Sequence, residues 1–296
     1  MADERPLHAG AVHRLPDATR VGTARLQVTL LDRSLTYYTK VLGLESRRET
    51  QNTAVLAAPG TSQALLVLEE QPDAQPAPRG GLLGLYHFAI LLPDRSHLGR
   101  FVRHLATRGI RFSAADHFVS EALYLWDPDG LGIEVYADRP REAWRTRGSE
   151  LVMTTEPLDL DALVDASGAE PWAGMPPGTT MGHMHLSVDD LERARAFYHE
   201  ALGLDQRVWS YPGALFLSAG GYHHHLGLNT WAAGARVASP DDARLIEWTL
   251  VLPTAAGAGA AAQRLQAAGH HAVSDGDDWI VTDPWHVQLR LTAGQD

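Results

Sequence analysis

The alternation of apolar and polar positions along the chain follows one plan four times. In the clearest copy, an apolar run over residues 84–93 predicts a buried strand, and residues 95–108 show helical periodicity that stops at Gly109. Short apolar segments typical of strands complete each copy. We therefore predict four βαβββ modules, named here A (21–70), B (84–137), C (181–230) and D (244–292).

The first and third modules align without a gap. Gly22 corresponds to Gly182 and Tyr38 to Tyr198, each at an offset of 160 residues (182 − 22 = 160). Their apolar positions agree, whereas many polar positions differ. A duplicated scaffold that has histidine and carboxylate side chains in only some of its copies indicates a single active site.

The modules predict an α+β protein. We expect a first domain over residues 21–137 (modules A and B) and a second over 181–292 (modules C and D). Residues 138–180 are expected to form a linker that contains a short helix in LDLDALVDAS. This linker is long enough to let module C pack in many positions relative to module B.

Composition restricts the possible partners and metals. The 296 residues have a net charge of −11, which argues against binding of nucleic acid, and no apolar run is long enough to span a bilayer. The first 17 residues lack the apolar stretch of a signal peptide, so we expect a cytoplasmic protein. Because the chain has no cysteine, histidine and carboxylate side chains must hold any metal, which favours Fe(II), Mn(II) or Zn(II).

Residues with metal-binding chemistry are concentrated in modules B and C. His87 lies on the first strand of module B, and Glu134 lies on its last strand, after the turn sequence DPDG. His183 and His185 are alternate residues on the first strand of module C, so their side chains face one side. The corresponding positions of the other modules hold Thr23 and Arg25 in module A, and Glu247 with Gln288 or Arg290 in module D.

These side chains are far apart in sequence, and any one of them alone could be structural. A single buried histidine is more often a core residue, and a single glutamate after a turn is often exposed. If modules B and C share one concave sheet, however, two histidines and one carboxylate would converge. That set leaves open positions on a divalent ion, as oxygen-activating non-haem Fe(II) requires.

Three sequence strings carry a family resemblance: GLYHFAILLPD, SEALYLWDPDGLGIEVYADRP and AGGYHHHLGLNTW. With the repeated Tyr and Leu-Gly-Leu positions, they resemble the vicinal oxygen chelate superfamily, and within it the type I extradiol dioxygenases of the catechol 2,3-dioxygenase kind. The resemblance covers nearly all of the chain beyond residue 20. It implies two glyoxalase/extradiol-dioxygenase-like domains with curved mixed sheets.

The resemblance also implies an activity in the catabolism of aromatic compounds. Members cleave a catechol with O2 next to its two hydroxyl groups and give a 2-hydroxymuconic semialdehyde type product. The expected cofactor is Fe(II), with Mn(II) as the alternative ion. The expected partners are a small catechol, O2 and further copies of the chain in a homo-oligomer.

The resemblance assigns roles to six residues of this chain. His183, His87 and Glu134 are the expected metal ligands, with His185 as the alternative to His183. Tyr124 is the expected hydrogen-bond donor to a substrate oxygen, and His117 is expected to support it. The acid–base residue is expected in the histidine triplet, where His225 is preferred and His223 and His224 remain open.

One departure from the family pattern predicts how the modules pair. Many extradiol enzymes build the active site within the C-terminal pair of modules, but module D here lacks both of the expected ligands, the histidine and the glutamate, at the matching positions. The site must then lie between modules B and C, and modules A and D form a structural pair. Two other functions stay open: a glyoxalase-type isomerase using Ni or Zn, and a small-molecule-binding protein without catalysis.

Overall fold

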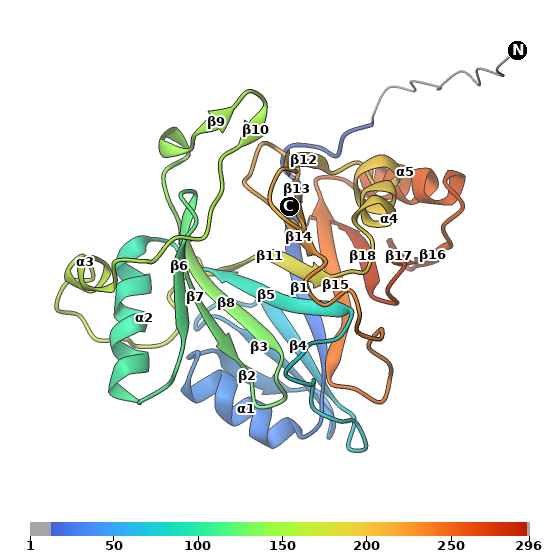
Figure 1. Ribbon diagram of the computed structural model, residues 1–296. Coiled ribbons are helices and arrows are strands. Elements are labelled where there is room, and N and C mark those ends of the chain that lie inside the picture. The colour runs from blue at the N-terminus through green and yellow to red at the C-terminus, as the bar shows by residue number, and fades with distance from the viewer. Residues whose placement is uncertain (1–12, 295–296) are drawn as a thin grey trace, which may run out of the picture.

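The computed structural model describes residues 13–294 and contains two eight-stranded sheets (Figure 1). Each sheet is built from the strands of two modules. The predicted α+β architecture of four βαβββ modules is confirmed. The helix predicted over residues 95–108 begins and ends within one residue of the observed helix, which is within the usual uncertainty of helix ends.

The first two modules have the following elements. Module A comprises β1 (Arg20–Val28), α1 (Leu31–Lys40), β2 (Glu45–Arg48), β3 (Thr53–Ala57) and β4 (Ala64–Glu70). Module B comprises β5 (Gly84–Leu91), α2 (Arg95–Thr107), β6 (Ser113–Asp116), β7 (Ser120–Trp126) and β8 (Gly132–Asp138). The linker that follows holds the 3-10 turn η1 (Arg141–Ala143), β9 (Thr146–Arg147), β10 (Glu150–Leu151) and α3 (Leu160–Asp165).

The last two modules repeat the order. Module C comprises β11 (Thr180–Ser187), α4 (Leu191–Arg195) continued by the π-helical η2 (Ala196–Ala201), β12 (Asp205–Val208), β13 (Ala214–Ser218) and β14 (Leu226–Asn229). Module D comprises β15 (Arg244–Leu252), α5 (Ala255–Ala267), β16 (Ala272–Asp275), β17 (Asp278–Thr282) and β18 (Gln288–Ala293).

The sheets pair the inner modules with each other and the outer modules with each other. One sheet has the order β12-β13-β14-β11-β5-β8-β7-β6, so β11 of module C and β5 of module B join antiparallel at its centre. The other has the order β16-β17-β18-β15-β1-β4-β3-β2. The predicted pairing of B with C and of A with D is confirmed. Residues 21–137 and 181–292 therefore each contribute strands to both sheets.

A repeated tyrosine–aspartate contact joins the two sheets. The Tyr38 hydroxyl on α1 donates to the Asp127 carboxylate in the turn of module B at 3.1 Å. In the second half of the chain, the Tyr198 hydroxyl donates to Asp283 at 2.7 Å. The tyrosine and turn positions of the repeat thus hold module A against B, and module C against D.

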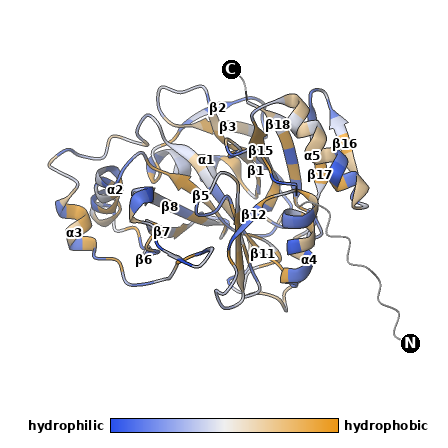
Figure 2. Ribbon diagram, turned by 90° about the horizontal axis from the view of Figure 1, so that it is seen from above, coloured by the Kyte–Doolittle hydropathy of each residue, from blue (hydrophilic) through white to orange (hydrophobic). Residues whose placement is uncertain are grey.

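Amphipathic patterning explains how the helices cover the sheets. In α2, Leu98, Phe101 and Leu105 are fully buried and recur at the spacing of one helix face. Asp94 begins this helix by accepting the backbone N–H of His97, and Gly109 follows its end with a φ of 64°. Figure 2 shows hydrophobic residues running through the strands, whereas the helices mix both kinds. No helix among the described residues is long and apolar enough to cross a membrane.

Candidate metal centre and active site

Strand register brings the predicted ligands together at the centre of the B–C sheet. Ala89 on β5 pairs with His183 on β11 at one side and with Glu134 on β8 at the other. His87 lies two residues before Ala89 and so faces the same side of the sheet. Three neighbouring strands thus direct these side chains toward one point.

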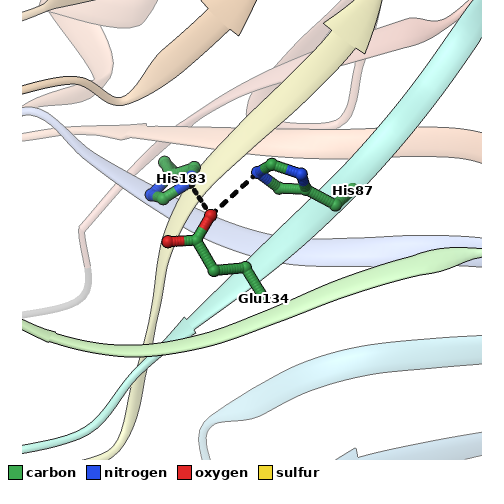
Figure 3. A group of neighbouring side chains, drawn as sticks. All are labelled: His87, Glu134 and His183. Atoms are coloured by element: carbon green, nitrogen blue, oxygen red, sulfur yellow. Dashed lines mark hydrogen bonds and ion pairs between the residues drawn. The ribbon is translucent and has the colours of Figure 1, made fainter. Parts of the chain in front are cut away.

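Figure 3 shows the Glu134 carboxylate between the two imidazole rings. Its Oε2 lies 2.9 Å from His87 Nε2 and 3.1 Å from His183 Nε2. All three side chains are buried, and one ligand atom from each lies within 4.8 Å of the other two. Within the described part of the chain, this is the one group of three such side chains close enough to hold a metal ion.

The geometry of this cluster suits a divalent cation. His87 Nε2 is buried and makes no properly aligned hydrogen bond in spite of its short distance to Glu134. An unsatisfied buried nitrogen is costly unless something else binds it. Nitrogen and oxygen ligands lie about 2.0–2.2 Å from such an ion, so ligand atoms on one ion are at most roughly 4.4 Å apart. Two histidines and one carboxylate are a donor set that leaves open positions on the ion.

The surroundings of the cluster favour the protonation states that metal binding needs. Burial opposes ionisation of Glu134, but His183 and His87 outweigh it and hold the pKa of the carboxyl well below its usual range. Burial lowers the pKa of His183 to about 4, although Glu134 acts in the opposite direction. A carboxylate and neutral imidazoles are the forms that coordinate metals.

His185 lies beside this cluster without belonging to it. Its ring centroid is 4.8 Å from that of His87, and its Nε2 accepts a hydrogen bond from the Asn229 side-chain amide at 3.0 Å. A nitrogen whose lone pair is engaged in this way is not free to bind a metal. The structure thus places His183, rather than His185, with the other two candidate ligands.

A cavity of ≈ 410 Å³ lies beside the cluster. His87 and Glu134 line it, together with Tyr124, His117 and His224. Its wall is otherwise largely apolar or aromatic and includes Tyr86, Leu125, Met153, Tyr211, Phe216 and Trp231. A flat aromatic molecule with polar groups at one edge fits this combination of wall and floor.

Tyr124 and His117 form a hydrogen-bonded pair beside the cluster. His117 Nδ1 lies 2.6 Å from the Thr154 carbonyl oxygen, and His117 Nε2 lies 2.6 Å from the Tyr124 hydroxyl. A carbonyl only accepts, so Nδ1 carries a proton. With a neutral His117 the Tyr124 hydroxyl donates to Nε2, whereas an imidazolium His117 donates to Tyr124 and frees the hydroxyl proton for a substrate oxygen.

The histidine triplet differs from the prediction in two respects. Residues 223–225 lie in the turn before β14, which begins at Leu226, and not on the strand itself. His225 faces away from the site: it lines a separate cavity of ≈ 240 Å³, and its Nδ1 accepts the backbone N–H of Ala219. The preference for His225 as acid–base residue therefore does not fit the geometry. His224, the neighbour that points the other way, lines the cavity with Glu134.

Several residues of the cavity wall were not predicted. Met153, Thr154 and Thr155 belong to the segment between modules B and C, which was expected to be only a linker. Thr154 fixes the orientation of His117, so this segment takes part in the site. No repeat signal could have revealed these residues, because the segment lies outside the modules.

Among residues 13–294, the A–D sheet has no comparable cluster at the corresponding place. Thr249 on β15 pairs with Arg290 just as Ala89 pairs with Glu134, so Arg290 is the structural counterpart of Glu134. Arg290 donates to Glu247, the counterpart of His87, with Nε 2.9 Å from Oε1. The A–D sheet thus has an ion pair between Arg290 and Glu247 at the place where the B–C sheet has candidate metal ligands.

Comparisons with known proteins agree with the geometry. Residues 20–135 and 180–289 match a family model described as the Glyoxalase/Bleomycin resistance protein/Dioxygenase superfamily. The chain is 45% identical over 270 residues to a protein of Bacillus subtilis (strain 168) named catechol-2,3-dioxygenase, covering 90% of this chain and 94% of that protein.

Solved structures show the same fold at low sequence identity. A putative dioxygenase from Bacillus subtilis superposes with a TM-score of 0.64 at 11% identity, covering 96% of this chain and 87% of that one. Glyoxalase I from Zea mays superposes with a TM-score of 0.55 at 20% identity, covering 93% and 92%. The chain belongs to the Glyoxalase/Bleomycin resistance protein/Dioxygenase superfamily.

Proposed function

We propose that this protein is an Fe(II)-dependent extradiol dioxygenase, which cleaves the ring of catechol or a substituted catechol with O2 to a 2-hydroxymuconic semialdehyde type product. The main support is the convergence of His87, Glu134 and His183 on one point. Two of them, His87 and Glu134, line a cavity that Tyr124 and His224 also line. The 45% identity to a protein named catechol-2,3-dioxygenase points to the same chemistry.

In this reaction the metal site, His224 and Tyr124 would have different roles. A bound Fe(II) would offer open positions both to the two oxygens of a catechol and to O2. His224 would exchange a proton with a substrate hydroxyl as a general base and acid. Tyr124, supported by His117, would form a hydrogen bond to a substrate oxygen as charge develops there.

The apolar wall of the cavity would favour a neutral aromatic ring and reduce access of water. The ring of Phe216 lies edge-on to the ring of His185, at 5.7 Å between centroids, and both residues line the cavity. This arrangement protects reactive species from hydrolysis.

The alternative of a glyoxalase-type isomerase has less support. Isomerases of this superfamily commonly use two carboxylates, whereas the cluster here has one, Glu134. Arg290, the module D counterpart of Glu134, lies in the other sheet, so module D adds no second carboxylate to the cluster.

The test is a reconstitution with Fe(II) under anaerobic conditions, followed by addition of catechol and air. We expect uptake of O2 and a yellow product. Parallel samples with Mn(II) and Zn(II) decide which ion supports the reaction. Protein that retains iron but consumes no O2 with catechol or its alkyl derivatives would contradict the proposal and favour an isomerase or a binding protein.

Variants of the ligands extend this test. His87→Ala, Glu134→Gln and His183→Ala should each lose bound iron and activity, because each leaves only two of the three ligands. Gln288→Ala, on the sheet without the cluster, is the matched control and should retain both. Unchanged iron content in His87→Ala would exclude the proposed centre.

A further inference from the structure

A chain of polar side chains leads from the cavity to the protein surface. His224 lines the cavity, and its Nδ1 lies 2.7 Å from Nδ1 of His223. His223 is fully buried, and its Nε2 lies 2.9 Å from Asp138 Oδ1. The Asp138 side chain at the end of β8 is 28% exposed. None of the roles described above uses His223 or Asp138.

The contacts of this chain determine where the protons lie. A carboxylate only accepts hydrogen bonds, so Nε2 of His223 carries the proton that faces Asp138. In a neutral His223, Nδ1 is then an acceptor. The short contact between the two Nδ1 atoms therefore requires His224 to donate from its own Nδ1. His224 Nε2 is left unprotonated, and it makes no hydrogen bond to any residue in the described range 13–294.

We propose that Asp138 and His223 are positioning residues that hold His224 in the tautomer with a free Nε2 lone pair. In this tautomer His224 can accept a proton from a substrate hydroxyl without first losing one of its own. The reasoning is that of a catalytic triad, where a buried carboxylate fixes the tautomer of a histidine base, except that a second imidazole transmits the effect here. The proposed role in turnover rests on the ring-cleavage function, whereas the tautomer follows from the contacts of a neutral His223.

The surroundings keep His223 in one orientation. Its ring lies 4.0 Å from that of Tyr222 and 5.4 Å from that of Trp144, measured between centroids. The Tyr222 hydroxyl also donates to Asp138 Oδ1, at 3.2 Å. Asp138 comes from module B and His223 from module C, so the tautomer of His224 depends on the pairing of these two modules.

The experiment is NMR of the full-length, metal-free protein labelled with 15N in histidine, in which ring nitrogen shifts distinguish protonated from unprotonated nitrogens. His224→Gln identifies the His224 signals. In the wild type we expect the His224 proton on Nδ1. In Asp138→Asn the side-chain amide can donate to His223 Nε2, so the proton order reverses and His224 gains a proton on Nε2.

Activity of the Fe(II)-loaded enzyme provides the second measurement. We expect Asp138→Asn to lower kcat by about 10²-fold, with KM and iron content nearly unchanged, because general base catalysis is impaired. Asp161→Asn is the matched control: it makes the same substitution at an exposed carboxylate on α3, so both the tautomer and kcat should stay as in the wild type.

Three outcomes would overturn the proposal. The first is a wild-type His224 with its proton on Nε2. The second is an Asp138→Asn protein in which neither the tautomer nor kcat changes, and the third is a loss of kcat in Asp161→Asn as large as in Asp138→Asn. If the wild type cleaves no catechol, the proposed function fails, but the NMR result still decides the tautomer.

Discussion

At the scale of the residue, the central feature is a carboxylate shared by two imidazoles. Glu134 Oε2 lies within 3.1 Å of a ring nitrogen of both His87 and His183. Burial alone would raise the pKa of Glu134, because a buried carboxylate is unfavourable without a partner. The two histidines stabilise its charge and keep the pKa of Glu134 well below its usual range. A divalent ion that enters between the three groups would replace these contacts with stronger ones.

Tyr124 should contribute to turnover without contributing to metal binding. Its hydroxyl bonds to His117, and the ligand cluster does not include it. We expect Tyr124→Phe to lower kcat/KM by about 10- to 100-fold, the loss of one hydrogen bond to a charged group. Steady-state kinetics together with iron analysis provide the measurement. If Tyr124→Phe loses its iron, the residue supports the metal centre and the assignment is wrong.

At the scale of the element, β8 combines most of the features of the site. Glu134 supplies a candidate ligand, and Asp138 at the end of the strand contacts His223. Gly132 at its beginning lets the strand approach β5 closely. An added Cβ at Gly132 would lie 2.1 Å from the Tyr86 carbonyl oxygen and 3.1 Å from the Cβ of His87.

Gly132→Ala should therefore force β8 away from β5. We expect the free energy of unfolding of the metal-free protein to fall by about 1–3 kcal/mol, the usual effect of overpacking. Affinity for Fe(II) should also fall, since His87 and Glu134 are on the two strands that separate. Urea unfolding and metal titration measure the two effects.

Gly234→Ala is the matched control for this substitution, because no atom lies within 4 Å of its added Cβ. Equal effects of the two substitutions on metal affinity would mean that the contact of β5 with β8 does not position the ligands.

The turn that precedes β8 should make stability depend on pH. Burial, with Asp129 acting in the same direction, raises the pKa of Asp127 to about 7. A raised pKa in the folded state means that Asp127 stabilises the fold at low pH, and that this contribution is lost as the pH rises from about 4 to 7.

Asp127→Asn removes this titration and gives the measurement. The free energy of unfolding of the wild type minus that of Asp127→Asn should decrease as the pH rises from 4 to 7. The decrease should be about 1.4 kcal/mol for each pH unit that separates the pKa of Asp127 in the folded protein from that in the unfolded chain. A difference that stays constant over this range would show that Asp127 is not perturbed.

The elements also explain which parts of the site the sequence could predict. Alternation of side chains along a strand and the offset between modules indicated His87, Glu134 and one of His183 and His185 as a group, and the family resemblance favoured His183. Neither signal reaches the turn before β14, where the backbone determines that His224 and His225 face opposite sides. The contacts of Thr154 and Asp138 join segments without any shared repeat, so only the folded chain reveals them.

At the scale of the whole molecule, four modules form a closed set of contacts. Sheets join A to D and B to C, and the tyrosine–aspartate contacts join A to B and C to D. The B–C sheet holds the three candidate metal ligands, whereas the corresponding positions of the A–D sheet hold Glu247 and Arg290, which form an ion pair. Among residues 13–294, the sheet that holds the candidate metal ligands is thus distinct from the sheet that holds their ion-paired counterparts.

This division of labour is testable at Arg290, the counterpart of Glu134. Arg290 bonds to Glu247 and also to Asp275 and Asp278. Arg290→Gln leaves the buried Glu247 without its partner, so we expect the free energy of unfolding to fall by about 1–3 kcal/mol. Activity per bound iron should not change. A loss of activity as large as that of Glu134→Gln would show that both sheets take part in the reaction.

The most direct test of the account is an anaerobic crystal structure of the protein loaded with Fe(II), with anomalous scattering at the iron edge. We predict one strong anomalous peak for each chain, bound by His87 Nε2, Glu134 and His183 Nε2 at about 2.0–2.2 Å. A peak between Glu247 and Arg290, or one at any other place in the chain, would contradict the account.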